Sequence, residues 1–276
     1  MSTHSNHHYV PVFLLKQWAG ADRKLSVFKR LPNGKLRHDR LGPKSVACDT
    51  HVYSLRRSSS EPDTRIERDF LGPQVDNLAA AVHAQMLKTG IGSLTPAQRV
   101  VWSRFLMAAL LRAPLIVEDL RSFGRTELHI VLETISPQPA EMDSLMREPR
   151  LSDMLDDHGM GTFLKAITSE KHIRWLCDST WSLVQLPSDS KDALICDYPV
   201  AYFGELMDNR FALVTPLSPR CIFICASNAD YQKKLGWMQA RELSKRINKR
   251  LVQHADQYVY STNRQHEALI AKYLGG

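Results

Sequence analysis

The chain has 276 residues, 43% of them hydrophobic, and a formal net charge of +7 at pH 7. This size and apolar content are ample for a packed interior in one large domain or two small ones, without disulfide or metal staples. No apolar stretch approaches the roughly 18 residues that a membrane-spanning helix needs, and no N-terminal secretion signal is recognisable. The sequence therefore predicts a cytoplasmic protein without a membrane segment.

The cysteines are odd in number and scattered, which is typical of free thiols in a reducing compartment rather than of a disulfide framework. Only Cys221 and Cys225 are close in the sequence, in the apolar run Cys-Ile-Phe-Ile-Cys. Because no second pair and no nearby histidine accompanies them, this run predicts a buried strand instead of a zinc site.

Positive charge is concentrated at the start of the chain. The first 48 residues contain two Asp and nine basic side chains, whereas the rest of the chain contains equal numbers of acidic and basic ones; the nine are Lys16, Arg23, Lys24, Lys29, Arg30, Lys35, Arg37, Arg40 and Lys44. A basic block of this kind attracts phosphate backbones or other anions. The alternative is a solvated hairpin surface that binds nothing.

Two histidines, His7 and His8, precede an apolar run over residues 9–18 that predicts a short helix or strand. Polar and apolar residues then alternate through residues 24–29, and the Asn33-Gly34 pair that follows is the strongest short-range signal of a β-hairpin. We predict a hairpin about Asn33-Gly34 that places its basic side chains on an exposed face.

From residue 64 the spacing of apolar residues becomes helical. Gly72-Pro73 must break or start an element, so we predict a helix over residues 73–88. Thr95-Pro96-Ala97-Gln98 has the capping-box pattern of a helix start, and the apolar residues after it predict a buried helix to residue 111. Arg112-Ala113-Pro114 interrupts that helix, and another is predicted over residues 115–135.

Past residue 180 the pattern changes to short apolar runs separated by Pro, Ser, Asp and Asn, which predicts an antiparallel sheet. The predicted strands are residues 181–186, 193–196, 211–214 and 221–225, followed by a helix over residues 237–253 and a strand over residues 257–261. The predicted fold is α+β, in a single domain over residues 1–276. It comprises a basic N-terminal β-hairpin region (1–63), a central helical bundle (64–180) and a C-terminal antiparallel sheet with packed helices (181–276).

Familiar catalytic motifs such as a Walker loop, a dinucleotide-binding turn or His-Glu-x-x-His are missing. Seven short segments, in order and spacing over nearly the whole chain, instead resemble the bacterial family catalogued as domain of unknown function 4238. They are His8-Tyr9-Val10-Pro11 with Phe13-Leu14-Leu15, Ile66-Glu67, Arg112-Ala113-Pro114, Cys196-Asp197-Tyr198-Pro199-Val200, Thr215-Pro216-Leu217-Ser218-Pro219, Ile247-Asn248 and Ala255-Asp256-Gln257-Tyr258-Val259-Tyr260-Ser261. The chain departs from the family pattern at Cys196, where the family usually has a serine, and at Asp76, where a second glutamate is expected. The family has no settled activity, so the resemblance selects residues but implies no reaction.

The residues that the resemblance selects are His8, Glu67, Asp76, Asp197 and Asn248. An imidazole with two or three carboxylates can hold a divalent metal, Mg²⁺ or Mn²⁺, and activate a water for phosphodiester hydrolysis. We therefore predict a metal-assisted nuclease or phosphodiesterase, in a bacterial defence or toxin role. Its catalytic residues would be His8, Glu67, Asp197 and Asn248, its metal ligands His8, Asp76 and Asp197, and its substrate-binding residues Arg23, Lys24, Lys29, Arg30 and Arg112.

Each of these residues also has a structural interpretation. His8 could brace the first element, Asp197 could form a turn, and Asn248 could bond to neighbouring backbone. For Arg112 we favour a buried salt bridge with Glu67 over an anion clamp, because a charge on an apolar helix must find a partner. His7 points away from His8 in either a strand or a helix, so we predict that the two do not share one site, that one of the pair faces solvent, and that His7 is incidental.

Two other functions are open on the sequence. The first is a non-catalytic module whose basic hairpin binds nucleic acid or an acidic partner, while the carboxylates are structural. The second is an enzyme that acts on a small anionic ligand, which predicts a closed pocket rather than an open basic groove.

Overall fold

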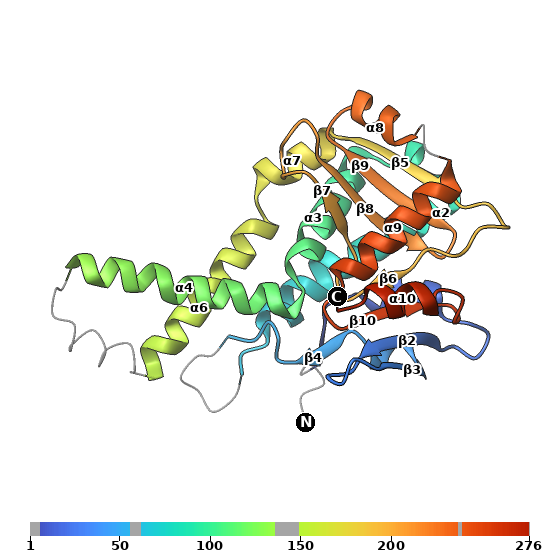
Figure 1. Cartoon of the computed structure of the whole chain (residues 1–276). Coiled ribbons are helices and arrows are strands. Elements are labelled where there is room, and N and C mark those ends of the chain that lie inside the picture. Colours follow the sequence, from blue (N-terminus) through green and yellow to red (C-terminus); the bar gives the residue numbers. More distant parts are fainter. Residues whose placement is uncertain (1–5, 56–61, 136–148, 237–238, 276) are drawn as a thin grey trace.

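The computed structural model describes residues 6–55, 62–135, 149–236 and 239–275 (Figure 1). Its strands are β1 (Asn6–His8), β2 (Leu25–Arg30), β3 (Leu36–Leu41), β4 (Cys48–Thr50), β5 (Thr180–Gln185), β6 (Ile195–Cys196), β7 (Ala201–Phe203), β8 (Ala212–Ser218), β9 (Cys221–Ala226) and β10 (Tyr258–Ser261). Its α-helices are α1 (Val12–Leu15), α2 (Asn77–Thr89), α3 (Pro96–Leu111), α4 (Pro114–Ile135), α6 (Pro149–Ile167), α7 (Glu170–Asp178), α8 (Ala229–Gly236), α9 (Ala240–His254) and α10 (Glu267–Tyr273). The chain also forms a π-helix, η3 (Ile66–Asp76), and the short 3-10 helices η1 (Lys16–Trp18), η2 (Pro43–Ser45) and η4 (Ile91–Ser93).

Two four-stranded antiparallel sheets organise the strands, in the orders β3-β2-β10-β6 and β5-β9-β8-β7, and β1 pairs separately with β4. With the helices around them, they confirm the predicted α+β class. The terminal strand β10 pairs with β2 of the N-terminal hairpin, so that Tyr258 lies opposite Lys29 and Tyr260 opposite Val27 (Figure 1). The hairpin region and the C-terminal region therefore share one sheet, a pairing that the sequence did not predict because it joins residues more than two hundred positions apart.

The predicted hairpin about Asn33-Gly34 is confirmed. β2 and β3 pair from Leu25 opposite Leu41 to Arg30 opposite Leu36. Gly34 adopts a φ of +77°, which glycine reaches without a steric penalty, and the Asn33 side chain accepts the N–H of Lys35 at 3.1 Å. The turn chemistry thus fixes the register of the hairpin locally.

The helix start at Thr95 is also confirmed as a capping box. The Thr95 hydroxyl accepts the N–H of Gln98 at 3.2 Å, and the Gln98 side chain accepts the N–H of Thr95 at 2.9 Å. The helix that follows, α3, lies in the interior, where its Trp102 stacks on Phe105 with ring centroids 4.6 Å apart and meets Phe223 of β9. Every residue of β9 is buried and its cysteines are free thiols, as expected for a core strand.

The prediction that Gly72-Pro73 starts a helix is wrong, because the helix begins before it and runs through Pro73 as η3. Proline has no N–H and would leave the carbonyl of Asp69 without its helical partner. The Gln74 side chain donates to that carbonyl at 2.8 Å, and at the end of η3 the N–H of Asn77 bonds to the carbonyl of Gly72, five residues back. The wider π-helical turn and this side-chain bond explain why the chain does not break here.

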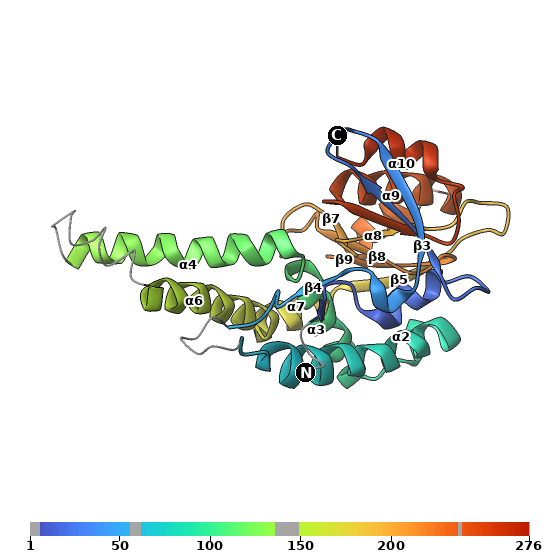
Figure 2. The ribbon, with the colours of Figure 1, turned by 90° about the horizontal axis from the view of Figure 1, so that it is seen from below.

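The helices α4 and α6 pack on each other and project from the rest of the molecule (Figures 1 and 2). They approach closely at Gly159 of α6, where a Cβ atom would collide with the backbone of Leu120 and Arg121. Within the described residues, no single helix is long and apolar enough to cross a membrane; α3 and the start of α4 pass that test only together, across a bend of 77°.

The close approach at Gly159 gives a stability prediction. Gly159→Ala should lower the free energy of unfolding by about 1–3 kcal/mol, because the methyl group has no space and the two helices must separate. Gly161→Ala in the same helix is the matched control, since nothing lies within 4 Å of its Cβ position. Urea denaturation should show Gly161→Ala to be neutral or stabilising by up to about 1 kcal/mol through helix propensity alone. Equal effects of the two substitutions would contradict the close packing.

Candidate functional site

Asp197 follows the short strand β6 and holds the turn that leads into β10. Its carboxylate accepts hydrogen bonds from the backbone N–H groups of Asp256 at 3.0 Å, Gln257 at 2.7 Å and Tyr258 at 2.8 Å. Asp197 as a whole is only 3% exposed. Burial raises the pKa of Asp197 to about 6, although the three N–H groups favour its charged form. Asp197 is therefore held rigidly, as a turn former, at one end of a cavity.

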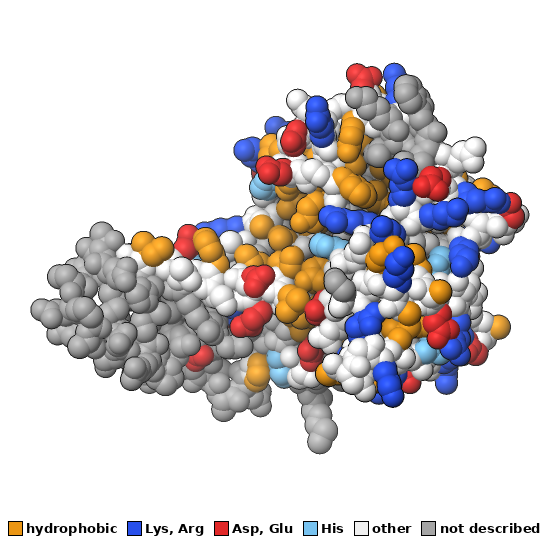
Figure 3. All heavy atoms as spheres, viewed as in Figure 1, with side chains coloured by type: hydrophobic (Ala, Val, Ile, Leu, Met, Phe, Trp, Pro, Cys, Tyr) orange, Lys and Arg blue, Asp and Glu red, His pale blue; other side chains and the backbone are white. Residues whose placement is uncertain are grey.

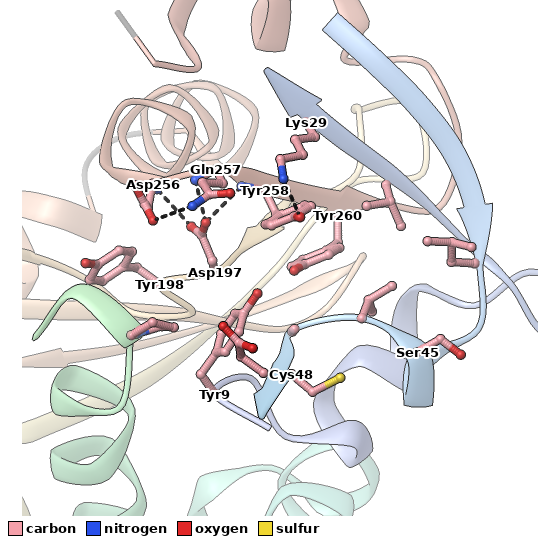
Figure 4. Close-up of a pocket in the computed structure, with 16 residues that line it drawn as sticks. Tyr9, Lys29, Ser45, Cys48, Asp197, Tyr198, Asp256, Gln257, Tyr258 and Tyr260 are labelled. Carbon is pink, nitrogen blue, oxygen red and sulfur yellow. Dashed lines mark hydrogen bonds between the residues drawn. The ribbon is translucent and has the colours of Figure 1, made fainter. Parts of the chain in front are cut away.

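This cavity, which we call the tyrosine pocket, has a volume of about 440 Å³ (Figure 4). Strands β2 and β10 form one wall, the segment 45–49 and Tyr9 form another, and the Asp197 turn closes one end (Figure 4). Its lining residues are Tyr9, Val27, Lys29, Leu41, Ser45, Val46, Ala47, Cys48, Asp49, Pro114, Asp197, Tyr198, Asp256, Gln257, Tyr258 and Tyr260. The size is in the range of pockets that bind small organic molecules.

Three tyrosines dominate the interior of this pocket. Tyr258 and Tyr260 lie two residues apart on β10, so both face the pocket, with parallel rings whose centroids are 6.3 Å apart. The Tyr260 hydroxyl is buried and interacts with the hydroxyl of Tyr9. The Tyr9 hydroxyl points toward it from the opposite wall (Figure 4). Because burial raises the pKa of Tyr9 and of Tyr260, both phenols stay protonated and can donate a hydrogen bond.

Lys29 supplies positive charge to the tyrosine pocket. Its Nζ donates to the Tyr258 hydroxyl at 2.8 Å and lies 4.7 Å from the centroid of that ring. Among the lining residues that the structure describes, Lys29 is the one Lys or Arg side chain, against the carboxylates of Asp49, Asp197 and Asp256. The pocket thus has a cationic wall at the hairpin and an acidic end at the Asp197 turn.

The structure does not bring His8 into this pocket. β1 pairs His8 with Cys48, and the His8 ring turns to the carbonyl of Lys44, with Nε2 3.3 Å from the oxygen. Burial lowers the pKa of His8. It is the next residue, Tyr9, that lines the pocket with Asp197.

Of the two histidines, His7 is the one that the fold buries. Its side chain is fully buried, its Nδ1 accepts the N–H of Tyr53 at 3.0 Å, and its ring stacks on the Tyr53 ring.

Glu67, Asp76 and Arg112 form a separate polar cluster among the helices. Arg112 is 1% exposed, and its Nη1 contacts the Asp76 carboxylate at 2.9 Å. The predicted buried salt bridge of Arg112 therefore exists, but its partner is Asp76 and not Glu67. Oε2 of Glu67, like Nε and Nη2 of Arg112, is buried and has no hydrogen-bond partner among the described residues. Burial, together with the nearby Asp76, raises the pKa of Glu67 to about 7, although Arg112 opposes the shift.

The remaining predicted site residues are dispersed. The Asn248 side chain joins α9 to the chain before β6, accepting the N–H of Leu194 at 2.8 Å and donating to the carbonyl of Asp192 at 2.9 Å. Arg30 donates to the carbonyl of Gly34 and to carbonyls at the end of α10, whereas Arg23 and Lys24 are exposed near the start of β2. Of the residues predicted from the sequence, Lys29 and Asp197 are the two that line the tyrosine pocket.

Metal binding was predicted at His8, Asp76 and Asp197, which bond respectively to Lys44, to Arg112 and to the turn at 256–258. In the part of the chain that the structure describes, no three His, Cys, Asp or Glu side chains converge closely enough to hold a metal ion.

Sequence reasoning missed the tyrosines. Tyr258 and Tyr260 alternate along a predicted strand and belong to a segment that carries the family resemblance, which was the available signal. Nothing local indicated that this strand would face Lys29 or that Tyr9 would close the opposite wall.

The raised pKa of Glu67 makes stability depend on pH. Between its ordinary pKa of 4.5 and its folded value of about 7, the folded protein holds a proton that the unfolded chain releases. The contribution of Glu67 to the free energy of unfolding should therefore decrease, by about 1–3 kcal/mol, as pH rises through this window. Urea denaturation across that range, for the wild type and Glu67→Gln, isolates this contribution as the difference between the two profiles. Glu118→Gln, which removes an exposed carboxylate of α4, is the control for loss of a carboxylate outside this cluster. A flat difference for Glu67→Gln would refute the assignment.

Comparison with known proteins gives one match. No curated protein and no solved structure matches the chain. A family model described as "Protein of unknown function (DUF4238)" matches residues 6–265 of the 276 residues. The matched region contains every lining residue of the tyrosine pocket, from Tyr9 to Tyr260. The chain thus belongs to the DUF4238 family, as its seven characteristic segments predicted.

Proposed function

We propose that the protein binds, in the tyrosine pocket, a small organic molecule with a carboxylate or phosphate group at one end and hydrogen-bond donors at the other. The observation that carries this proposal is the pair of phenol hydroxyls, Tyr9 and Tyr260, that face each other across the pocket beside Lys29. Because a hydrogen bond between two phenols uses only one of their two O–H groups, the second O–H can donate to a ligand oxygen placed against it. Lys29, on the neighbouring strand and the same wall, supplies the charge that makes an anionic oxygen the favoured acceptor.

The rest of the pocket indicates what else such a ligand would carry. The parallel rings of Tyr258 and Tyr260, with Val27 and Val46, offer apolar surface to a ring or hydrocarbon part. The carboxylates of Asp256, at the other end, and of Asp49, on the wall opposite β2 and β10, can accept hydrogen bonds from ligand N–H or O–H groups. A ligand with an acidic group at one end and hydrogen-bond donors at the other fits both ends of the pocket.

The ionisable groups of the pocket favour binding over nucleophilic chemistry. Burial raises the pKa of the Cys48 thiol, with Asp49 adding to the shift, so the reactive thiolate is disfavoured. Burial also raises the pKa of Tyr198 to about 12. The carboxylate of Asp197 is already engaged by three backbone N–H groups. We therefore propose recognition of the anion and assign no covalent step to these residues.

Substitution of Tyr260 tests the proposal. Tyr260→Phe removes only the hydroxyl, so it should leave thermal stability unchanged or raised while weakening binding about 10- to 100-fold through the lost charge-assisted hydrogen bond. Lys29→Met should weaken binding at least as much. Lys24→Met, on the same hairpin but outside the pocket, removes the same charge and should leave binding unchanged.

The probes are acetate, inorganic phosphate and nucleoside monophosphates, ranked by thermal shift and then measured by calorimetry. If none of them binds, or if Tyr260→Phe and Lys29→Met bind as well as the wild type, the proposal fails.

The metal-assisted nuclease remains a prediction of the sequence, and a direct assay decides it. The purified protein should cleave RNA or DNA with Mg²⁺ or Mn²⁺, and His8→Ala and Asp197→Ala should each abolish cleavage. Because Asp197→Ala also releases the turn at 256–258, Asp197→Asn serves as the milder variant. Absence of cleavage with either metal, or full activity in both His8→Ala and Asp197→Ala, would remove the nuclease from consideration.

A further inference from the structure

Helix α9 presents a strongly basic face to solvent. Its inner face is apolar and buried, through Leu243, Ile247, Leu251 and Val252. Its outer face carries five basic side chains and a single acidic one, Glu242; the basic ones are Arg241, Lys245, Arg246, Lys249 and Arg250. Lys and Arg side chains gather over α9 and α10 on the side of the molecule shown in Figure 3. We call the five basic residues the α9 face.

Ion pairs neutralise only part of this charge. Arg241 pairs with Asp189, and Arg246 pairs with Glu242 one turn away at 3.1 Å. Lys245, Lys249 and Arg250 have no acidic partner within the described ranges. Lys249 lies 4.9 Å from the ring centroid of Tyr273, and Arg250 lies 5.9 Å from that of Phe203. These contacts leave their charges available to an external anion.

A second cavity adjoins the N-terminal half of the α9 face. It has a volume of about 380 Å³ and is lined by Asp189, Ser190, Lys191, Arg241, Ser244, Lys245, Asn248, His266 and Leu269. Three cations and one carboxylate therefore surround it, which favours an anion. The side of the cavity formed by Asn248 and His266 is held in place by hydrogen bonds. The Asn248 side chain is hydrogen-bonded to the chain at 192–194, and the His266 ring lies 2.8 Å from the carbonyl oxygen of Asp192.

An exposed aromatic ring lies beyond the other end of the α9 face. Tyr202 of β7 is 41% exposed, and its ring contacts that of His254, the last residue of α9, with centroids 6.0 Å apart. His254 follows Arg250 by one helical turn, so the ring continues the line of cations. From Arg241 to Arg250 the helix rises about 14 Å, enough for several phosphates in succession.

From this arrangement we infer that the α9 face binds the sugar-phosphate backbone of a single-stranded nucleic acid, with one phosphate in the cavity beside Lys245 and a base stacked on Tyr202. Cations in a row with an exposed aromatic ring at the end are the combination that single strands recognise, because every base offers a face for stacking. An anionic membrane fits less well, since the apolar side chains of α9 point inward and no large hydrophobic side chain of the helix is exposed. This site is distinct from the tyrosine pocket, and the two share no lining residue.

Removal of charge from the α9 face tests the inference. The triple substitution Lys245→Gln, Lys249→Gln and Arg250→Gln should weaken binding of a fluorescein-labelled oligothymidylate about tenfold or more, and it should make the affinity less dependent on salt. The matched control removes three charges from the hairpin region, through Arg23→Gln, Lys24→Gln and Lys35→Gln. That control should retain most of the affinity. Thermal melting and circular dichroism of both variants report whether each remains folded.

Tyr202→Ala separates stacking from simple charge attraction. It should weaken binding of the single strand about 5- to 100-fold while changing the affinity for a duplex of the same length much less. Loss of affinity in the hairpin control but not in the α9 variant would overturn the inference. Tighter binding of phosphatidylserine vesicles or of polyglutamate than of the oligonucleotide would also overturn the inference. The same would follow if Tyr202→Ala bound the oligonucleotide as tightly as the wild type does. These results are independent of the tyrosine pocket, so the failure of either proposal can be told from that of the other.

Discussion

The three hydrogen bonds that the Asp197 carboxylate accepts from consecutive backbone N–H groups are the interaction on which the pocket depends. They fix the point at which the chain leaves α9 and enters β10. Side chains alternate between the faces of a strand, so a shift of one residue at this turn would move Tyr258 and Tyr260 to the opposite face of the sheet. The register of β10 against β2, and with it the meeting of Lys29 and Tyr258, therefore follows from one buried carboxylate.

The fold was predictable wherever a few neighbouring residues determine it. The Asn33-Gly34 hairpin, the capping box at Thr95 and the buried strand β9 each follow from local chemistry, and all three are present. Prediction failed where a side-chain contact compensates for a local rule or where distant segments pair. Pro73 should interrupt a helix, but the Gln74 side chain satisfies the carbonyl that proline leaves open. The pairing of β10 with β2 had no local signal, because each strand is an ordinary alternating segment by itself.

The candidate site, like the pairing of β10 with β2, depends on contacts between residues far apart in the sequence. Asp197 was identified from the family resemblance and Lys29 from the charge of the N-terminal segment, two unrelated arguments that the fold brings to one cavity. Of the adjacent residues His8 and Tyr9, the sequence favoured the more reactive histidine. Which of the two faces the pocket is decided by the pairing of β1 with β4, some forty residues later in the chain, and that pairing directs Tyr9 inward. Residue chemistry alone could rank the candidates but could not orient them.

Charge counted along the sequence does not show which basic side chains the fold leaves unpaired on its surface. In the first 48 residues, Arg30 donates to carbonyls at the end of α10 and Arg40 pairs with Asp22. The rest of the chain is neutral in sum, yet the amphipathic α9 places its cations on one face while the compensating acids lie elsewhere. That face is positioned by the same kind of interaction as the pocket. Asn248 ties the middle of α9 to residues 192–194, and the Asp197 turn ties down the chain just after it, so two buried polar side chains set the position of both the tyrosine pocket and the α9 face.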